Sequence, residues 1–157
     1  MSSDTVGAAR CAESATVLGM WRALSRRDWA EVATFLAPDC IYADMPVGPT
    51  AAARGPQDII KRLKIGLESL AAYENHDGLL VADGPHVMYE HSETWTWPTG
   101  ERAVLPFVTV HRVLDERIIL WKDYWDMGGL TNHAPANWLS DFATADMSWV
   151  YDATGQL

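Results

Sequence analysis

The amino-acid sequence predicts an α+β protein in which helices come first and an antiparallel sheet follows. Stretches of helical apolar periodicity fall before residue 71, and from residue 71 to 126 the chain is rich in β-formers interrupted by turn signals. Because the two kinds of element are segregated along the chain, we expect the helices to cover one face of a curled sheet.

Three helices are predicted in the first part of the chain. Residues 13–27 carry an apolar stripe at i, i+3, i+4 and i+7 spacing, formed by Val17, Met20, Trp21 and Leu24. Asp28 is placed to cap a second helix over residues 29–37, which Pro38 would end. A third helix is expected over residues 56–70, because proline suits its first turn and apolar residues recur along it.

Strands are predicted around and after these helices. Residues 40–46 alternate and end at a proline, which is typical of a short strand. Further on, three turn signals separate runs of 10 to 13 residues, which predicts a four-strand antiparallel meander over 71–82, 86–97, 102–114 and 117–126. The tail from 128 to 157 has no clear period, and we expect it to form short helices and a flap.

Length and composition bound the function. At 157 residues the chain is predicted to be a single domain, 1–157, with a C-terminal extension over about 128–157. The net charge of −9 argues against a nucleic-acid partner, and no apolar run approaches the length of a membrane span. The first residues lack the pattern of a signal peptide, so we expect a cytoplasmic location. Cys11 and Cys40 are read as unpaired thiols.

The stretch W121-K-D-Y-W-D126 indicates where chemistry could lie. Side chains alternate along a strand, so Trp121, Asp123 and Trp125 share a face, and a carboxylate between two indoles is costly unless it is used. Similar parity groups other chemically capable residues, provided that their face is the inner one. They are Tyr42 and Asp44 in the short strand, His91, Glu93 and Trp95 in the second long strand, and Phe107 and His111 in the third.

Such a face could form a small-molecule site, because burial would raise the pKa values of its carboxyl groups and supply an acid and a base together. Other interpretations stay open. Asp123 could form an ion pair with a helix arginine, and His91 with Glu93 could be a solvent-exposed pair. The H-x-E pattern at 91–93 lacks a third metal ligand at defined spacing, so no metal or other cofactor is expected.

The order of elements, with Y-A-D-M-P at 42–46 and W-K-D-Y-W-D at 121–126, resembles the SnoaL-like and limonene-epoxide-hydrolase-like branch of the nuclear transport factor 2-like superfamily. The resemblance covers about residues 12–130 and implies a cone-shaped barrel. By position, Tyr42 and Asp123 match catalytic residues of limonene-type epoxide hydrolases, and Asp44 stands in place of an asparagine. His91 replaces the arginine that links two carboxylates there, and Glu93 replaces an aspartate.

These departures favour an eliminating enzyme over a hydrolase. We therefore predict a cofactor-independent lyase that removes water or a small aldehyde from a hydrophobic, aromatic small molecule, with His91 and Asp123 transferring protons and Tyr42 polarising an oxygen. Asp44 and Glu93 would set the charge states. Trp95, Phe107, His111, Trp121 and Trp125 are the candidate substrate-binding residues. The alternatives are an epoxide hydrolase and a non-catalytic aromatic-ligand-binding protein, and the resemblance implies a homodimer.

Overall fold

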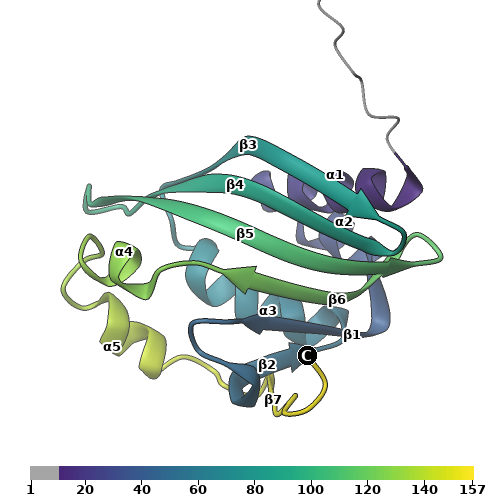
Figure 1. The fold of residues 1–157 in the computed structure, drawn as a ribbon. Helices are drawn as coiled ribbons and strands as arrows, with labels where there is room; N and C mark the ends of the chain where they lie inside the picture. The colour runs from purple at the N-terminus through teal and green to yellow at the C-terminus, as the bar shows by residue number, and fades with distance from the viewer. Residues whose placement is uncertain (1–10) are drawn as a thin grey trace, which may run out of the picture.

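A single curved sheet of seven strands forms one layer, and three helices pack behind it as the second (Figure 1). The computed structural model describes residues 11–157, so the start of the chain, on which the signal-peptide prediction depends, lies outside it. The strand order is β3-β4-β5-β6-β1-β2-β7. The strands are β1 (Leu36–Asp44), β2 (Ala52–Arg54), β3 (Ala72–Asp83), β4 (His86–Thr96), β5 (Arg102–Leu114), β6 (Arg117–Tyr124) and β7 (Val150–Tyr151).

The α+β class and the four-strand meander are confirmed. The long strands begin and end within two residues of the predicted limits, because alternation and turn residues are local signals. The sheet has two free edges, at β3 and β7, so it curves without closing into the expected barrel. It is also not wholly antiparallel, since β1 pairs in parallel with β6.

The helices are α1 (Ala12–Ser25), α2 (Trp29–Thr34) and α3 (Pro56–Leu67), with a one-turn 3-10 helix, η1 (Pro49–Ala51), before β2. Asp28 caps α2 as predicted, by accepting a hydrogen bond from the Glu31 N–H. The predicted end of this helix at residue 37 is wrong. Leu36 pairs with Ile118 of β6 and the Phe35 carbonyl accepts from the Ile118 N–H, so strand pairing takes over three residues earlier.

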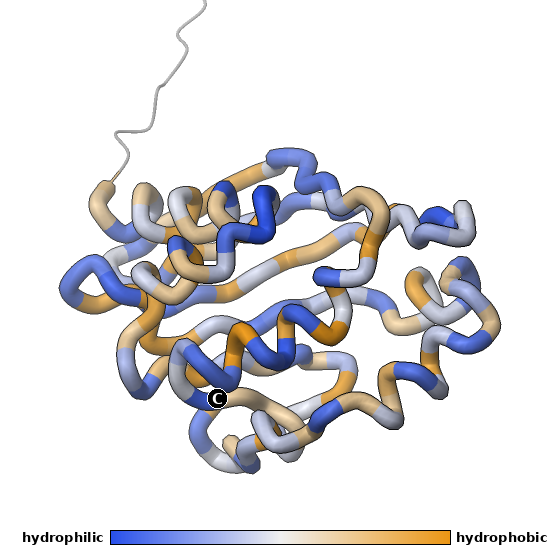
Figure 2. Tube along the Cα trace, turned by 180° about the vertical axis from the view of Figure 1, so that it is seen from behind, coloured by the Kyte–Doolittle hydropathy of each residue, from blue (hydrophilic) through white to orange (hydrophobic). Residues whose placement is uncertain are grey.

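The inner face of the meander is the face that parity grouped. In β4 the residues from Val87 to Trp95 on this face are buried, while their outward neighbours Met88 and Glu90 are exposed. The helices bury apolar side chains such as Trp21, Leu24 and Ile59 in the core, and hydrophobic and hydrophilic residues alternate along α3 (Figure 2). The core therefore lies between the concave side of the sheet and α1 to α3, and the candidate residues lie within it.

After β6 the chain forms α4 (Met127–Thr131) and α5 (Trp138–Ala143), and β7 then pairs with β2 as the last strand of the sheet. The two helices lie beyond one end of the sheet (Figure 1), so the tail does form short helices as predicted. Helix α5 has no buried residue. It is therefore held only by partial contacts, over a part of the molecule that contains the site.

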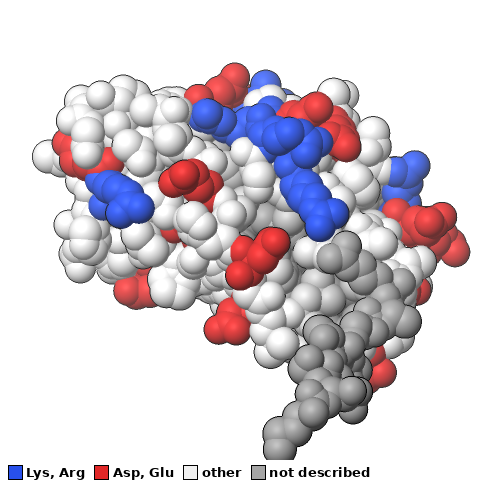
Figure 3. All heavy atoms as spheres, turned by 90° about the horizontal axis from the view of Figure 1, so that it is seen from above, with Lys and Arg blue, Asp and Glu red and all other residues white. Residues whose placement is uncertain are grey.

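The surface carries charges of both signs (Figure 3), and the two cysteines are unpaired. On the face seen in Figure 3 acidic and basic side chains are interspersed among uncharged ones. Cys11 and Cys40 are both free thiols, as predicted. No helix between residues 11 and 157 has the length and apolar character needed to cross a bilayer.

Candidate active site

A cavity of about 100 Å³, here called the inner cavity, lies between the concave face of the sheet and α3. Apolar and aromatic side chains form most of its wall, and a few acidic groups converge on it, which is the usual make-up of a small-molecule site. Seven of the ten predicted site residues line it: Tyr42, Asp44, Glu93, Trp95, Phe107, Asp123 and Trp125.

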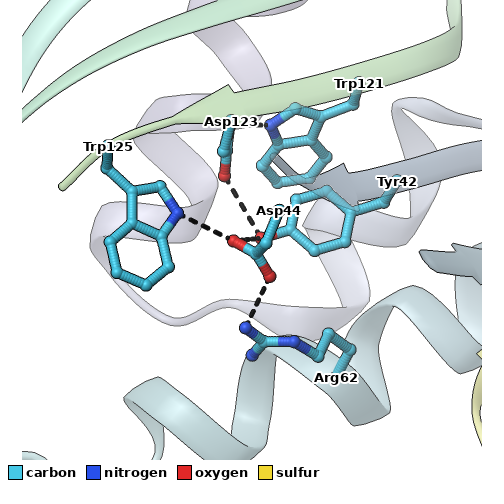
Figure 4. Close-up of polar contacts among 6 residues, drawn as sticks. All are labelled: Tyr42, Asp44, Arg62, Trp121, Asp123 and Trp125. Carbon is cyan, nitrogen blue, oxygen red and sulfur yellow. Dashed lines mark hydrogen bonds and ion pairs between the residues drawn. The ribbon is translucent and has the colours of Figure 1, made fainter. Parts of the chain in front are cut away.

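Asp44, at the end of β1, is the centre of a polar cluster (Figure 4). Its Oδ1 accepts from the Tyr42 hydroxyl at 2.9 Å and from the Trp125 indole N–H at 3.0 Å. Its Oδ2 pairs with the Arg62 guanidinium of α3, and both side chains are largely buried. Burial disfavours the Arg62 charge, but Asp44 and the other neighbouring oxygens raise its pKa above the usual value, so the guanidinium stays charged.

Asp123 lies beside this cluster and is 3% exposed. Its Oδ1 accepts from the Trp121 N–H at 2.6 Å, and its Oδ2 lies 3.2 Å from the Tyr42 hydroxyl oxygen. Burial, then the negative charges of Asp44 and Glu93, hold the Asp123 pKa well above its usual range. The single Tyr42 hydroxyl proton therefore lies between two acceptors, the closer Asp44 oxygen and the Asp123 oxygen.

Glu93 is a second buried acid, held from the other side of the cavity. Its Oε1 accepts from the Tyr73 hydroxyl and its Oε2 from the Trp95 N–H, both at 2.8 Å. Burial raises the Glu93 pKa to about 7, although these two hydrogen bonds act in the opposite direction. At neutral pH this group therefore exchanges between acid and base forms, beside Asp123, whose pKa burial also raises.

The three remaining predicted residues lie in the core behind the cavity. His91 stacks on Tyr89 with ring centroids 4.7 Å apart, and neither ring nitrogen has a hydrogen-bond partner within residues 11–157. Burial lowers the His91 pKa to about 4, so the ring is neutral. His111 accepts from the Trp21 N–H at 3.3 Å. Trp121 contacts the site through its hydrogen bond to Asp123 and by packing on the Tyr42 ring, with centroids 4.7 Å apart. Since neither His91 nitrogen has a partner among the described residues, His91 and Asp123 do not form a hydrogen-bonded pair.

Sequence reasoning missed two polar residues that line the cavity. The helix arginine weighed as a partner for Asp123 exists, but Arg62 pairs with Asp44 instead. Helical spacing could have indicated it. Arg62 follows Ile59 by three positions and precedes Gly66 by four, so it lies on the same face of the helix as these two buried residues. Tyr73, near the start of β3, was missed because parity was not followed along that strand.

The family model of the SnoaL-like domain matches residues 17–121, about two thirds of the chain. The chain belongs to the SnoaL-like family. The match ends inside β6, so the SnoaL-like domain of this chain is followed by α4, α5 and β7, which lie outside the matched residues.

Solved structures show the same SnoaL-like fold. An epoxide hydrolase of M. tuberculosis described as LEH-like is 24% identical, with a TM-score of 0.66 over 78% of this chain and 91% of that one. A putative SnoaL-like polyketide cyclase from Shewanella putrefaciens is 18% identical, with a TM-score of 0.70 over 77% of this chain and 94% of that one. At such identities the likeness concerns the fold, and function has to be argued from the site.

The side chains around the cavity are not arranged as a metal site. Within residues 11–157 no group of three or more His, Cys, Asp and Glu side chains is arranged to bind a metal ion. The three carboxyl groups already bind indole N–H, tyrosine hydroxyl or guanidinium donors. The arrangement is instead suited to moving protons: it combines one ion pair, one carboxyl group whose pKa is raised well above its usual range, and one that titrates near pH 7.

Proposed function

We propose that the protein is a cofactor-independent lyase that eliminates water from a hydrophobic, aromatic small molecule bound in the inner cavity. The observation that carries the proposal is the presence of two buried carboxyl groups, both with pKa values raised by burial, in one apolar cavity. Pairs of titratable groups whose environments separate their roles are typical of acid–base active sites.

In this mechanism Glu93 is the base and Asp123 is the acid. The Glu93 carboxylate takes a proton from carbon, and the electrons of that C–H bond form the new C=C bond. The C–O bond breaks as Asp123 gives its proton to the departing hydroxyl group, which leaves as water. Transfer of the proton from Glu93 back to Asp123 restores the enzyme. Glu93 replaces His91 in the role first assigned to the histidine, since His91 does not line the cavity.

The remaining residues prepare these two groups. The Arg62–Asp44 ion pair keeps a fixed negative charge near Asp123, which favours the protonated form of the acid. Tyr42 donates to Asp44 and lies within hydrogen-bond distance of Asp123, so it orients the acid and can contact the substrate oxygen. Trp95, Phe107 and Trp125 supply flat walls for an aromatic ring.

A screen of aromatic alcohols, diols and epoxides in heavy-oxygen water tests the proposal. The expected result is a product lighter than the substrate by one water, or by a one-carbon aldehyde if a carbon–carbon bond breaks instead. A Glu93→Gln variant is expected to lose this activity. Tight binding without any product would contradict the enzyme proposal and favour a binding protein.

The second candidate is an epoxide hydrolase. It is favoured by the likeness in fold to the LEH-like epoxide hydrolase of M. tuberculosis and by the Tyr42–Asp123 contact, which can place an acid beside an epoxide oxygen. In the same screen it would appear as a diol that has gained one labelled oxygen. The mass of the product therefore separates the two candidates in one experiment.

We also propose that the chain forms a homodimer and acts in the cytoplasm, as expected from the sequence and the resemblance. Support for the dimer comes from the outer face of the sheet, which exposes large apolar side chains that a second copy would cover, among them Leu79, Val81, Met88, Val104 and Tyr124. Light scattering after size exclusion should give twice the chain mass. A Val104→Lys variant that still elutes as a dimer would argue against this face.

A further inference from the structure

A second hollow, here called the outer groove, lies next to the inner cavity and shares lining residues of α5 with it. Its volume is about 340 Å³, more than three times that of the inner cavity. Aromatic and proline side chains make up much of its wall, and Trp97 forms part of it from the strand side. Exposed polar residues, including Ser69, lie along its edge.

The two spaces are separated by side chains that belong to both. Trp138 and Phe142 of α5 line the inner cavity and the outer groove alike, and their ring centroids are 5.7 Å apart. Since α5 has no buried residue, few contacts oppose a shift of these two rings. The Trp138 and Phe142 rings thus form a boundary between the inner cavity and the outer groove.

A second connection runs through the end of β4. The Trp97 ring packs against Trp95, with ring centroids 5.9 Å apart, and Trp95 lines the inner cavity while Trp97 lines the outer groove. Trp97 is 4% exposed, yet its indole N–H has no hydrogen-bond partner among residues 11–157. The two packed indoles therefore join the wall of the inner cavity to the wall of the outer groove.

Much of the groove is built by residues beyond the SnoaL-like match. That match ends at residue 121, whereas Trp138, Phe142 and their neighbours on α5 come from the C-terminal extension. The extension therefore adds a binding space next to the family's common domain. The inner cavity alone has room for roughly one benzene-sized ring, so a longer molecule needs a second space.

We propose that the outer groove is a second subsite, which holds a second aromatic ring of the molecule whose reacting end lies in the inner cavity. The occupant is thus an elongated two-ring compound whose distal ring packs against the aromatic side chains of the outer groove. This inference rests on the proposed function for the reacting end. It adds to that function the substrate class and a role for the C-terminal extension.

Calorimetric titration with two probes tests the subsite. The one-ring probe is 1-phenylethanol and the two-ring probe is 1,2-diphenylethanol. Burying a second ring should make the two-ring probe bind at least roughly tenfold more tightly to the wild-type protein. Ser69→Trp, at an exposed position on the groove edge, should fill the groove and remove this advantage while the affinity for 1-phenylethanol stays unchanged.

Two further variants serve as controls. Glu68→Trp places the same bulk at the neighbouring exposed position, which lines neither space, and should keep the two-ring advantage. Val47→Trp, at the half-exposed rim of the inner cavity, should weaken both probes. Each variant is expected to fold, because the substituted positions are exposed, and far-ultraviolet circular dichroism checks this.

The outcomes separate this inference from the proposed function. If the wild-type protein binds both probes equally, or if Ser69→Trp leaves the two-ring advantage in place, the outer groove is not a subsite and the proposed function stands. If neither probe binds the wild-type protein, the aromatic substrate of the proposed function fails and the subsite fails with it. Loss of the advantage in Ser69→Trp but not in Glu68→Trp supports the subsite.

Discussion

Replacement of Glu93 by glutamine should remove a pH-dependent loss of stability from the wild-type protein. The two side chains have nearly the same shape, and the glutamine can keep both contacts of Glu93. Its oxygen must face the Trp95 N–H, which can only donate, and its amide group then donates to the Tyr73 oxygen. The variant therefore differs from the wild type mainly in lacking a group that titrates.

The magnitude follows from the pKa of Glu93, which burial raises from 4.5 to about 7. Because the folded-state pKa is above the unfolded value, the neutral acid is favoured by folding. Its contribution is present in full below pH 4.5 and is lost as pH rises through about 7. At about 1.4 kcal/mol for each pKa unit, the wild type should lose roughly 3 kcal/mol relative to Glu93→Gln between pH 4.5 and pH 9.

Urea unfolding of both proteins, followed by tryptophan fluorescence at pH 4.5, 7 and 9, measures this difference. The buried histidines titrate in both proteins, so their effects largely cancel. Glu90→Gln, on the exposed face of the same strand, is the matched control and should show a difference that does not change with pH. A wild-type to Glu93→Gln difference that is constant within about 0.5 kcal/mol would refute the assigned burial and protonation of Glu93.

The remaining predictions concern the neighbouring groups. Asp123→Asn should lower turnover by roughly 10²- to 10⁴-fold while the circular dichroism spectrum is unchanged, and a folded variant with normal rate would remove Asp123 from the mechanism. Arg62→Met should cost about 3–5 kcal/mol in urea unfolding by leaving Asp44 buried without its cation, and adding Asp44→Asn should recover part of that loss. His91 has a pKa lowered to about 4, so its stabilising contribution is present above pH 6.5 and is lost as pH falls through about 4. His91→Phe should therefore gain stability relative to the wild type between pH 6.5 and 4 and keep wild-type turnover at pH 7.5, whereas lost turnover would return the histidine to the reaction.

Much of the fold could be predicted because its signals are local. Turn residues and period-2 alternation located the four long strands, and the stripe through Trp21 and Leu24 located the first helix. The second helix was predicted too long because Leu36 has no local signal for a strand. It becomes one only by pairing with Ile118, which is 82 positions away along the chain. The parallel pairing of β1 with β6 was missed for the same reason.

The candidate site was predictable in part. Parity along single strands placed Glu93, Trp95 and Phe107 on one face, and the structure brings them to one cavity. Parity also placed His91 there, but a face is larger than the cavity it borders. How deep each residue lies along the curved sheet depends on how the helices pack over it, and His91 is covered by Trp21 of α1, with ring centroids 4.3 Å apart.

The sequence by itself determined the order of elements. It also determined which acidic and aromatic residues share a face of each strand, because alternation is a property of the strand's own backbone. Only the tertiary structure decided which face is inner, which acid holds a cation and which residues reach a ligand. Arg62 and Asp44 are 18 positions apart, on a helix and a strand, and their pairing requires the packing of α3 on β1. The charges and pKa values of the site arise from that packing, since burial and proximity are defined only in the folded chain.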